Sequence, residues 1–392
     1  MESIYLLWNN LMKNIRLSFF VLLLISVGCK NESAQKLEFS TKSWVMEGFQ
    51  KADSINPILK PTAESKFVCP ISGQEVAWEA RNTLNPSAVV KDGKVYLFYR
   101  AQDPTGTSRI GLAISSDGLH FEKSPQPVFY PDNDDMKIYE WNLNKQAGIP
   151  QPKGCTTCYF DGVEDPRIVE REDGTYLMTY TAYDGKTARL ALATSKDLVT
   201  WEKKGLAFNT EKYIDEWSKS GAIVCKKAGD KVIATKIDGK YWMYFGDTQL
   251  SIAYSDDLIH WTIAVNEENQ NMISVLHPRP GYFDSRLVEP GPFALLQEAG
   301  ILLIYNASNA ANFNDSQLPK FTYAAGQALF DKENPVKLID REASYFIHPD
   351  KDYEKIGEVN DVCFVEGLVF LNNQSFLYYG TADSKVAVAV RE

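Results

Sequence analysis

Short hydrophobic runs separated by polar turns repeat along most of the chain. Each clear copy has an aromatic run, then a run of small residues with alternating polarity, then a turn that leads into Phe or Trp. The three clear copies occupy residues 95–121, 176–201 and 241–261. A tight turn with an Asp-Gly pair precedes each aromatic run, at 91–94, 172–174 and 237–240. Because Asp-Gly between hydrophobic runs is typical of β-hairpins, the pattern predicts repeated antiparallel strands.

Two weaker copies extend the repeat, at 286–339 and 359–389. Together the copies give about five units of about four strands each, and no long helical periodicity interrupts them. A β-propeller stacks such sheets radially and leaves only short edges. We therefore predict an all-β, five-bladed β-propeller over residues 66–392, in which a strand within 66–79 closes the ring. A β-sandwich is the rival architecture, but the regular period argues against it.

Residues 1–29 have the organisation of a secretion signal. A basic segment at 12–16 precedes an apolar run at 17–27, which is too short to span a bilayer as a stable helix. The run leads into Cys29, in a context similar to a bacterial lipoprotein box. We expect lipidation of Cys29, with ordinary signal cleavage nearby as the alternative, and a polar tether over 30–65. The protein would then be extracytoplasmic and membrane-anchored, in the periplasm or on the cell surface.

Composition and charge narrow the classes of partner. The chain has 392 residues, of which 44% are hydrophobic and 12% aromatic, which is enough for a large core. Its formal net charge is −10 and it has no basic stripe, so nucleic acids and anionic membrane surfaces are poor partners. Neutral sugars remain suitable ligands.

Cysteine and histidine spacing predicts neither a metal site nor a cofactor site. Cys155 and Cys158 form a Cys-X-X-Cys motif, but a structural zinc site needs a second ligand pair and the sequence has none. We expect a local disulfide or two buried thiols at this motif. The four histidines include no pair with metal-ligand spacing.

Polar residues recur where the innermost strand of each predicted blade begins. In a propeller these positions face one mouth of the central channel, so their side chains converge on a rigid scaffold, as ligand pockets require. The alternative is that they hydrogen-bond within the channel and hold the blades together. The positions are Asn85 and Ser87, 164–167, Lys219, Glu289 and Asp361.

Three motifs resemble glycoside hydrolase family 130. They are Asn85-Pro86-Ser87 with Arg100-Ala101, residues 162–167 (Gly-Val-Glu-Asp-Pro-Arg) and residues 378–383 (Tyr-Tyr-Gly-Thr-Ala-Asp). The resemblance covers essentially the whole chain after about residue 66. It implies a five-bladed propeller that acts on β-mannosides, either as a phosphorylase that transfers mannose to phosphate or as a hydrolase of β-1,2-mannosides.

The resemblance also implies roles for single residues. Asp165 matches the general acid of the family, which protonates the glycosidic oxygen through a sugar hydroxyl. Arg167 is expected to hold this acid or a substrate hydroxyl. The positions that bind the mannose losing its bond match Asn85, Ser87, Arg100 and Asp383. The full set of expected substrate-binding residues is Asn85, Ser87, Arg100, Glu164, Arg167, Arg189, Lys219, Asn306, Asp361 and Asp383.

Two departures from the family pattern favour hydrolysis. Where phosphorylases of the family carry His-Arg, this chain has Phe245-Gly246-Asp247, and where they carry Tyr-His it has Tyr305-Asn306. Basic residues suit a phosphate dianion, because a desolvated dianion needs charge-assisted donors. Asp247 and Glu289 would instead repel phosphate, and they suit a base that activates water.

An inverting mechanism follows from two carboxyl groups with different roles. Asp165 would protonate the leaving oxygen while Glu289 or Asp247 deprotonates water on the opposite face, at a separation of about 6.5–9.5 Å. A donor near neutral pH needs a raised pKa on Asp165, unless a substrate hydroxyl relays the proton. We therefore predict an inverting, exo-acting hydrolase of β-mannosides, with β-1,2-linked mannooligosaccharides as substrate and mannose as product.

Two alternative functions stay open. Lys219 and Arg189 are candidate anion binders. The first alternative is therefore a β-mannoside phosphorylase that gives mannose 1-phosphate. A non-catalytic glycan-binding propeller lipoprotein is the other alternative. The sequence also leaves the formation of a homo-oligomer open.

Overall fold

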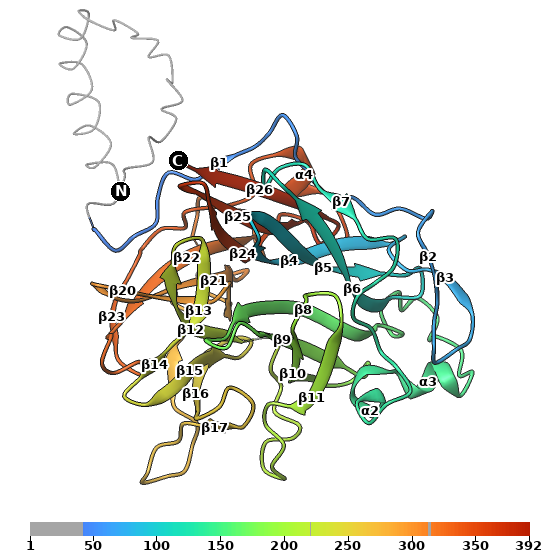
Figure 1. Ribbon diagram of the computed structural model, residues 1–392, viewed down its shortest axis with the longest axis horizontal. Coiled ribbons are helices and arrows are strands. Elements are labelled where there is room, and N and C mark those ends of the chain that lie inside the picture. The colour runs from blue at the N-terminus through green and yellow to red at the C-terminus, as the bar shows by residue number, and fades with distance from the viewer. Residues whose placement is uncertain (1–41, 220, 313–314) are drawn as a thin grey trace, which may run out of the picture. The chain divides into compact units, whose positions relative to one another are not determined.

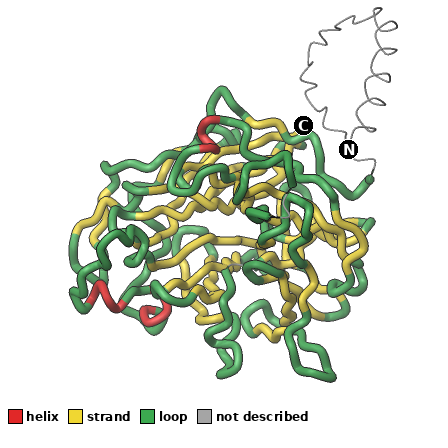
Figure 2. Tube along the Cα trace, turned by 180° about the vertical axis from the view of Figure 1, so that it is seen from behind, coloured by secondary structure: helices red, strands yellow, loops and turns green. Residues whose placement is uncertain are grey.

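The computed structural model describes residues 42–219, 221–312 and 315–392, which form a fold built almost entirely of β-strands (Figure 1; Figure 2). Helix in these residues is limited to the short segments α2 (Lys137–Glu140), α3 (Leu143–Gln146) and α4 (Asp352–Lys355). The prediction of an all-β fold is confirmed. None of the described helices has the length and apolar character needed to cross a membrane. The predicted signal segment at 1–29 and its Cys29 lie outside the described residues.

Antiparallel pairing links most of the described strands into five successive groups. Group 1 contains β4 (Asn82–Lys91), β5 (Lys94–Gln102), β6 (Thr107–Ser115) and β7 (Glu122–Lys123). Group 2 contains β8 (Asp161–Glu170), β9 (Tyr176–Tyr183), β10 (Ala188–Ser195) and β11 (Trp201–Leu206). Group 3 contains β12 (Ala222–Ala228), β13 (Lys231–Ala234), β14 (Lys236–Ile237), β15 (Lys240–Phe245), β16 (Leu250–Ser255), β17 (Trp261–Ile263) and β18 (Ser274–Leu276).

The last two groups follow the same order along the chain. Group 4 contains β19 (Leu287–Pro290), β20 (Ala294–Gln297), β21 (Gly300–Ser308), β22 (Tyr323–Phe330) and β23 (Leu338–Arg341). Group 5 contains β24 (Cys363–Leu371), β25 (Gln374–Thr381), β26 (Lys385–Arg391) and β1 (Gln50–Lys51). Group 5 therefore joins the two ends of the described chain.

The strand that completes group 5 is not the predicted one. β1 pairs with β26, with Gln50 opposite Val390, and Figure 1 shows the two strands side by side. The segment expected to close the ring instead forms β2 (Lys66–Val68) and β3 (Glu75–Ala77), which pair with each other in a separate two-stranded sheet. A two-residue strand is too short to show a hydrophobic period, so the pattern gave no sign of β1.

The folded part of the chain also begins earlier than predicted. Trp44 and Met46 lie in the buried core, and the Met46 N–H donates to Gln327 Oε1 at 2.8 Å. Asn56 exchanges hydrogen bonds with both backbone groups of Val388, each at 2.9 Å. Much of the segment predicted as a tether over 30–65 is therefore part of the fold.

Apolar side chains pack between neighbouring groups. The first strands of groups 1 to 5 are β4, β8, β12, β19 and β24, and several of these first strands are in contact. Phe98 of group 1 meets Trp201 of group 2 with ring centroids 5.7 Å apart, and Tyr244 of group 3 meets Phe330 of group 4 at 4.7 Å. The first strand β4 contacts both β8 and β24, and β8 contacts β12. This arrangement brings the first strands of groups 1, 2, 3 and 5 close together.

A buried triad of tyrosine, carboxylate and cation recurs in four of the five groups described. The tyrosine of a central strand donates to a fully buried carboxylate, and a Lys or Arg from an edge strand pairs with the same carboxylate. The triads are Tyr99–Glu79–Lys123, Tyr180–Glu140–Lys203, Tyr305–Asp284–Arg341 and Tyr379–Glu354–Lys51. A buried carboxylate is tolerated when it is paired and hydrogen-bonded, so each triad ties an edge strand to the interior of its group.

Breaking the triad of group 5 tests how much β1 contributes to stability. We expect Glu354→Ala to lower the free energy of unfolding by about 3–5 kcal/mol, because Lys51 and the Tyr379 hydroxyl both lose a buried partner. Tyr379→Phe removes one hydrogen bond and leaves the ion pair, so we expect a loss of about 1 kcal/mol. Urea unfolding measures both losses, with the exposed Glu298→Ala as the control. Equal losses for the two triad variants would contradict this account.

Candidate active site

Three first strands carry a bulge at a polar residue of the candidate site. The pairing register shifts at Asn85 in β4, at Asp165 in β8 and at Glu366 in β24. Pro86 and Pro166 follow the first two residues, and because proline cannot donate to the ladder, it favours a bulge. Asn85 and Asp165 have φ of 47° and 50°, in the left-handed region that Asn and Asp tolerate. The bulges turn these side chains toward each other, and Asn85 Nδ2 donates to Asp165 Oδ1 at 2.9 Å.

Asp165 lies in a buried polar cluster with Arg100 and Glu164. The Arg100 guanidinium is 3.3 Å from Asp165 Oδ1 and 2.6 Å from Glu164 Oε1. The Ser108 hydroxyl donates to the same Glu164 oxygen at 2.9 Å. The structure therefore brings together four residues that the sequence predicted for one site. They are Asn85, Arg100, Glu164 and Asp165.

The pKa of Asp165 is lowered, which bears on how this residue could donate a proton. Burial alone would raise this pKa, but nearby cations hold it below its ordinary value. These cations are Arg100, Lys219 and Arg167. Burial instead raises the pKa of the neighbouring Glu164, although Arg100 opposes the shift. Of the two predicted ways for Asp165 to donate near neutral pH, a raised pKa is therefore absent from the free protein, and a relay through a substrate hydroxyl stays a prediction.

Glu289 and Asp247 converge on one lysine. Lys219 Nζ lies 3.2 Å from Glu289 Oε2 and 3.5 Å from Asp247 Oδ2. The Trp217 indole N–H donates to Asp247 at 2.9 Å. Burial, with the carboxylates of Asp247 and Asp165, raises the pKa of Glu289 to about 7 despite the charge of Lys219. The Glu289 side chain is 3% exposed and that of Lys219 is 32% exposed, so this part of the cluster opens to solvent at the lysine.

Asp383 and Tyr323 lie within electrostatic reach of these groups. Burial raises the pKa of Asp383 to about 6, and the carboxylate of Asp165 adds to the shift. Burial, with the charge of Glu289, raises the pKa of Tyr323 to about 12. The Tyr323 N–H donates to the Asp361 carbonyl at 2.9 Å, so Asp361 adjoins the cluster through its backbone. Tyr323 was not predicted.

The polar atoms of Ser87 and Asn306 are used to hold strands together. Ser87 Oγ accepts the Ile168 N–H at 3.0 Å, which joins β4 to β8. The fully buried Asn306 donates to the Val365 carbonyl at 2.8 Å and accepts the Val365 N–H at 2.7 Å, which joins β21 to β24. These contacts argue against the predicted binding of substrate by both side chains. For these two residues they favour the alternative, in which channel residues join neighbouring blades.

The positive charge of Arg189 is balanced by two neighbouring carboxylates. Its guanidinium lies 2.7 Å from Asp184 and 2.6 Å from Asp215, and it packs over the Tyr139 ring at 5.2 Å. Because two carboxylates already share its charge, Arg189 is poorly suited to hold an added anion. The structure therefore argues against the predicted anion-binding role.

The Cys-X-X-Cys motif forms one of the two expected arrangements. Cys155 and Cys158 are joined by a disulfide. Within the part of the chain that the structure describes, no group of three or more His, Cys, Asp or Glu side chains is arranged to hold a metal ion. The motif therefore belongs to the loop before β8, and it contributes no ligand to the polar cluster.

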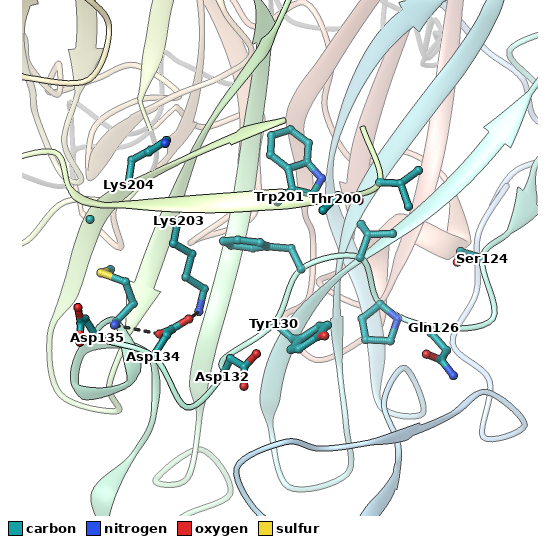
Figure 3. Close-up of a pocket in the computed structure, with 16 residues that line it drawn as sticks. Ser124, Gln126, Tyr130, Asp132, Asp134, Asp135, Thr200, Trp201, Lys203 and Lys204 are labelled. Atoms are coloured by element: carbon teal, nitrogen blue, oxygen red, sulfur yellow. Dashed lines mark hydrogen bonds and ion pairs between the residues drawn. The ribbon is translucent and has the colours of Figure 1, made fainter. Parts of the chain in front are cut away.

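A separate hollow lies between the loop that follows β7 and the strand β11 (Figure 3). It has a volume of about 820 Å³ and is lined by side chains that include Tyr130, Trp201 and Lys203. Lys203 pairs with Asp134 at 2.9 Å across this hollow, as Figure 3 shows. None of the lining residues belongs to the polar cluster around Asp165, Lys219 and Glu289, so the two regions are distinct.

The family relationship is shown by comparison with known proteins. Residues 50–392 match the model of glycoside hydrolase family 130, which is described as beta-1,4-mannooligosaccharide phosphorylase. The chain belongs to glycoside hydrolase family 130. A 1,2-beta-oligomannan phosphorylase of Thermoanaerobacter sp. (strain X514) is 30% identical to this family 130 chain over 350 residues, covering 86% of this chain and 96% of that protein.

Solved structures are also similar to this family 130 chain. A glycosyl hydrolase from Bacteroides ovatus is 40% identical with a TM-score of 0.83, covering 90% of this chain and 96% of that one. A second structure has the same identity, TM-score and coverage. It was described with the finding that the GH130 family of mannoside phosphorylases contains glycoside hydrolases that target β-1,2 mannosidic linkages in Candida mannan. The family 130 chain is thus an enzyme of the glycosidase type.

Proposed function

We propose that this enzyme is a five-bladed β-propeller that hydrolyses β-mannosides with inversion and releases mannose from the end of β-1,2-linked oligosaccharides. The five strand groups correspond to five blades, and the neighbouring first strands correspond to the lining of the central channel. The β-1,2 linkage is supported by the names of similar proteins. These are the 1,2-beta-oligomannan phosphorylase from Thermoanaerobacter and the structure described with hydrolases that target β-1,2 linkages in Candida mannan.

The observation that carries hydrolysis is that every described cation of the cluster already lies against a carboxyl group. Among the described residues, the cluster holds six carboxyl groups and three cations, and each cation is already in an ion pair. The carboxyl groups are those of Glu164, Asp165, Asp247, Glu289, Glu366 and Asp383. The cations are Arg100, Arg167 and Lys219. A phosphate dianion needs unopposed charged donors, whereas a neutral sugar and a water molecule do not.

The proposed reaction uses two carboxyl groups on opposite faces of the mannose. The bond from C1 to the glycosidic oxygen breaks as Asp165 delivers a proton to that oxygen through a sugar hydroxyl. Glu289, or Asp247, takes a proton from water, and the water oxygen forms the new bond to C1 from the other face. The pKa of about 7 suits Glu289 to act as a base near neutral pH.

The second candidate function is phosphorolysis, and the curated relatives favour it. Two proteins of Thermoanaerobacter sp. (strain X514), at 30% and 29% identity, are both named phosphorylases. Lys219, with 32% of its side chain exposed, is the cation best placed to meet an anion. Phosphorolysis would require a phosphate to displace Glu289 and Asp247 from this lysine.

Product analysis with β-1,2-mannobiose, with and without inorganic phosphate, separates the candidates. Hydrolysis gives free mannose at equal rates in both reactions. Phosphorolysis gives mannose 1-phosphate, and only when phosphate is present, which would overturn our proposal. A protein that binds the disaccharide without forming either product would support a glycan-binding function instead.

The two carboxyl groups also predict the pH dependence of kcat/KM. The pKa of Asp165 is lowered and that of Glu289 is raised to about 7, so between these values the pair holds one proton. That proton rests on Glu289, whereas catalysis needs it on Asp165 with Glu289 ionised. Only the pair with one proton can react, and the pair loses this proton as the pH rises through about 7. We expect kcat/KM to fall about tenfold per pH unit above about pH 7. Initial rates at low substrate concentration measure this, and a value that still rises beyond pH 8 would contradict the assignment.

A further inference from the structure

Arg167 connects the strand of the proposed acid to the strand of the proposed base. It lies on β8, two residues after Asp165, and is 4% exposed. Its Nη1 donates to the Asp165 carbonyl at 2.9 Å. Its Nη2 donates to the Pro290 carbonyl and its Nε to the Gly291 carbonyl, at 2.9 and 2.8 Å. Because Pro290 directly follows Glu289, one planar guanidinium spans the backbones that carry both catalytic carboxyl groups.

Glu366 is the ion-pair partner of this guanidinium. Glu366 Oε1 lies 2.6 Å from Arg167 Nη1, and Glu366 is 1% exposed. Neither of its carboxyl oxygens makes a hydrogen bond among the described residues, so the contact with Arg167 is an ion pair without a hydrogen bond. The carboxylate therefore acts mainly on Arg167, and it comes from a third first strand, β24, at the bulge of that strand.

Burial raises the pKa of Glu366 well above its ordinary value, although the charge of Arg167 opposes the shift. Removing Glu366 would leave the buried guanidinium without the carboxyl group that lies beside it. Burial of an unpaired charge is unfavourable, so Arg167 would turn toward other carboxylates or toward water. Asp165 already interacts electrostatically with Arg167, so it is one such carboxylate within the cluster. Either change would loosen the three carbonyl contacts that fix the two strands.

We propose that Glu366 is a positioning residue, which holds Arg167 so that the guanidinium sets the distance between the Asp165 and Glu289 carboxyl groups. This inference rests on the proposed hydrolysis through those two groups. Inversion depends on a fixed gap that admits one water molecule between the base and the sugar. The Arg167–Glu366 pair provides a rigid, buried means of keeping that gap constant from one turnover to the next.

The test compares Glu366→Ala, Glu366→Gln and Arg167→Lys with the wild type, using β-1,2-mannobiose. We expect Glu366→Ala to lower kcat about 100-fold, the effect of misplacing catalytic groups by about 1 Å. KM should stay within about threefold, because Arg167 and Glu366 are both buried, at 4% and 1% exposure. Glu366→Gln keeps the size of the side chain and an oxygen beside Arg167, so we expect it to restore kcat to within about tenfold of wild type. Arg167→Lys cannot span three carbonyls and should resemble Glu366→Ala.

Glu79→Ala is the matched control, because Glu79 is also fully buried and pairs with Lys123 at 2.7 Å outside the cluster. Glu79→Ala should lower the melting temperature without changing kcat per folded molecule. Circular dichroism and thermal melting give the folded fraction. A kcat for folded Glu366→Ala equal to that of wild type would overturn the positioning role, as would equal losses in Glu366→Ala and Glu79→Ala. A wild type that requires phosphate would overturn hydrolysis, while the same pattern of kcat losses would still support positioning. A wild type without any turnover would overturn both.

Discussion

Replacing Asp165 with asparagine is expected to lower kcat by about 10²- to 10⁴-fold, the usual contribution of a general acid. The amide keeps the size of the carboxylate and can still accept the 2.9 Å hydrogen bond from Asn85. Asparagine also tolerates the left-handed backbone that Asp165 adopts, at φ 50°. The variant should therefore fold normally and lose the proton that the leaving oxygen needs. Mannose release from β-1,2-mannobiose measures the loss, and calorimetric titration measures the remaining affinity.

Two comparisons make the Asp165→Asn result specific. Asp256→Asn changes an exposed aspartate that pairs with Lys240 at 2.7 Å, and it should leave both kcat and affinity unchanged. A substrate with a highly acidic leaving group, such as a dinitrophenyl β-mannoside, should recover much of the lost rate in Asp165→Asn, because its leaving oxygen needs no proton. Wild-type turnover by Asp165→Asn on mannobiose would remove Asp165 from the acid role.

The fold was predictable because its signal is periodic and local. The aromatic runs at 95–99, 176–180 and 241–245 lie within β5, β9 and β15, and the small-residue runs lie within the strands that follow them. The strand β1 lacked such a signal, since two residues cannot show a period. Its role depends instead on a long-range contact, between Lys51 and the buried Glu354.

Site residues were predictable where the residue type itself favours the local backbone conformation. Asn85 and Asp165 each precede a proline at a bulge, and that local chemistry is visible in the sequence. Ser87 and Asn306 occupy first and central strands as expected, but hydrogen-bond partners across strands decide their use, and the sequence does not show these partners. Glu366 carried a signal that was overlooked, because it is the single charged residue in the apolar run 363–371.

The pKa values could not be predicted because they depend on which charges surround each group. Asp165 and Glu164 are adjacent in sequence and both are buried, yet their pKa values shift in opposite directions. Arg100 and Lys219 lower the pKa of both groups. Arg167 and the hydrogen bond from Asn85 lower that of Asp165 further, whereas the charge of Asp165 raises that of Glu164. The separation between these two neighbours in sequence therefore comes from the three-dimensional placement of charges.

Replacing Glu289 with glutamine is expected to lower hydrolysis by about 10²- to 10⁴-fold, because the attacking water loses its base. The amide also removes a charge beside Lys219, so the lysine should pair more closely with Asp247, which is already 3.5 Å away. Sodium azide should restore turnover in this variant, since azide attacks C1 without giving up a proton. The product would be the α-mannosyl azide, formed by inversion at C1, which nuclear magnetic resonance identifies.

The same experiment decides between the two candidate bases. Asp247 accepts the Trp217 indole N–H at 2.9 Å and its side chain is 14% exposed, whereas that of Glu289 is 3% exposed. The more buried carboxylate, with a pKa raised to about 7, is the better base near neutral pH. We therefore expect azide to rescue Glu289→Gln and not Asp247→Asn, whose smaller loss would come from a changed environment of Lys219. Rescue of Asp247→Asn alone would assign the base to Asp247 and leave Glu289 as the group that holds the lysine in place.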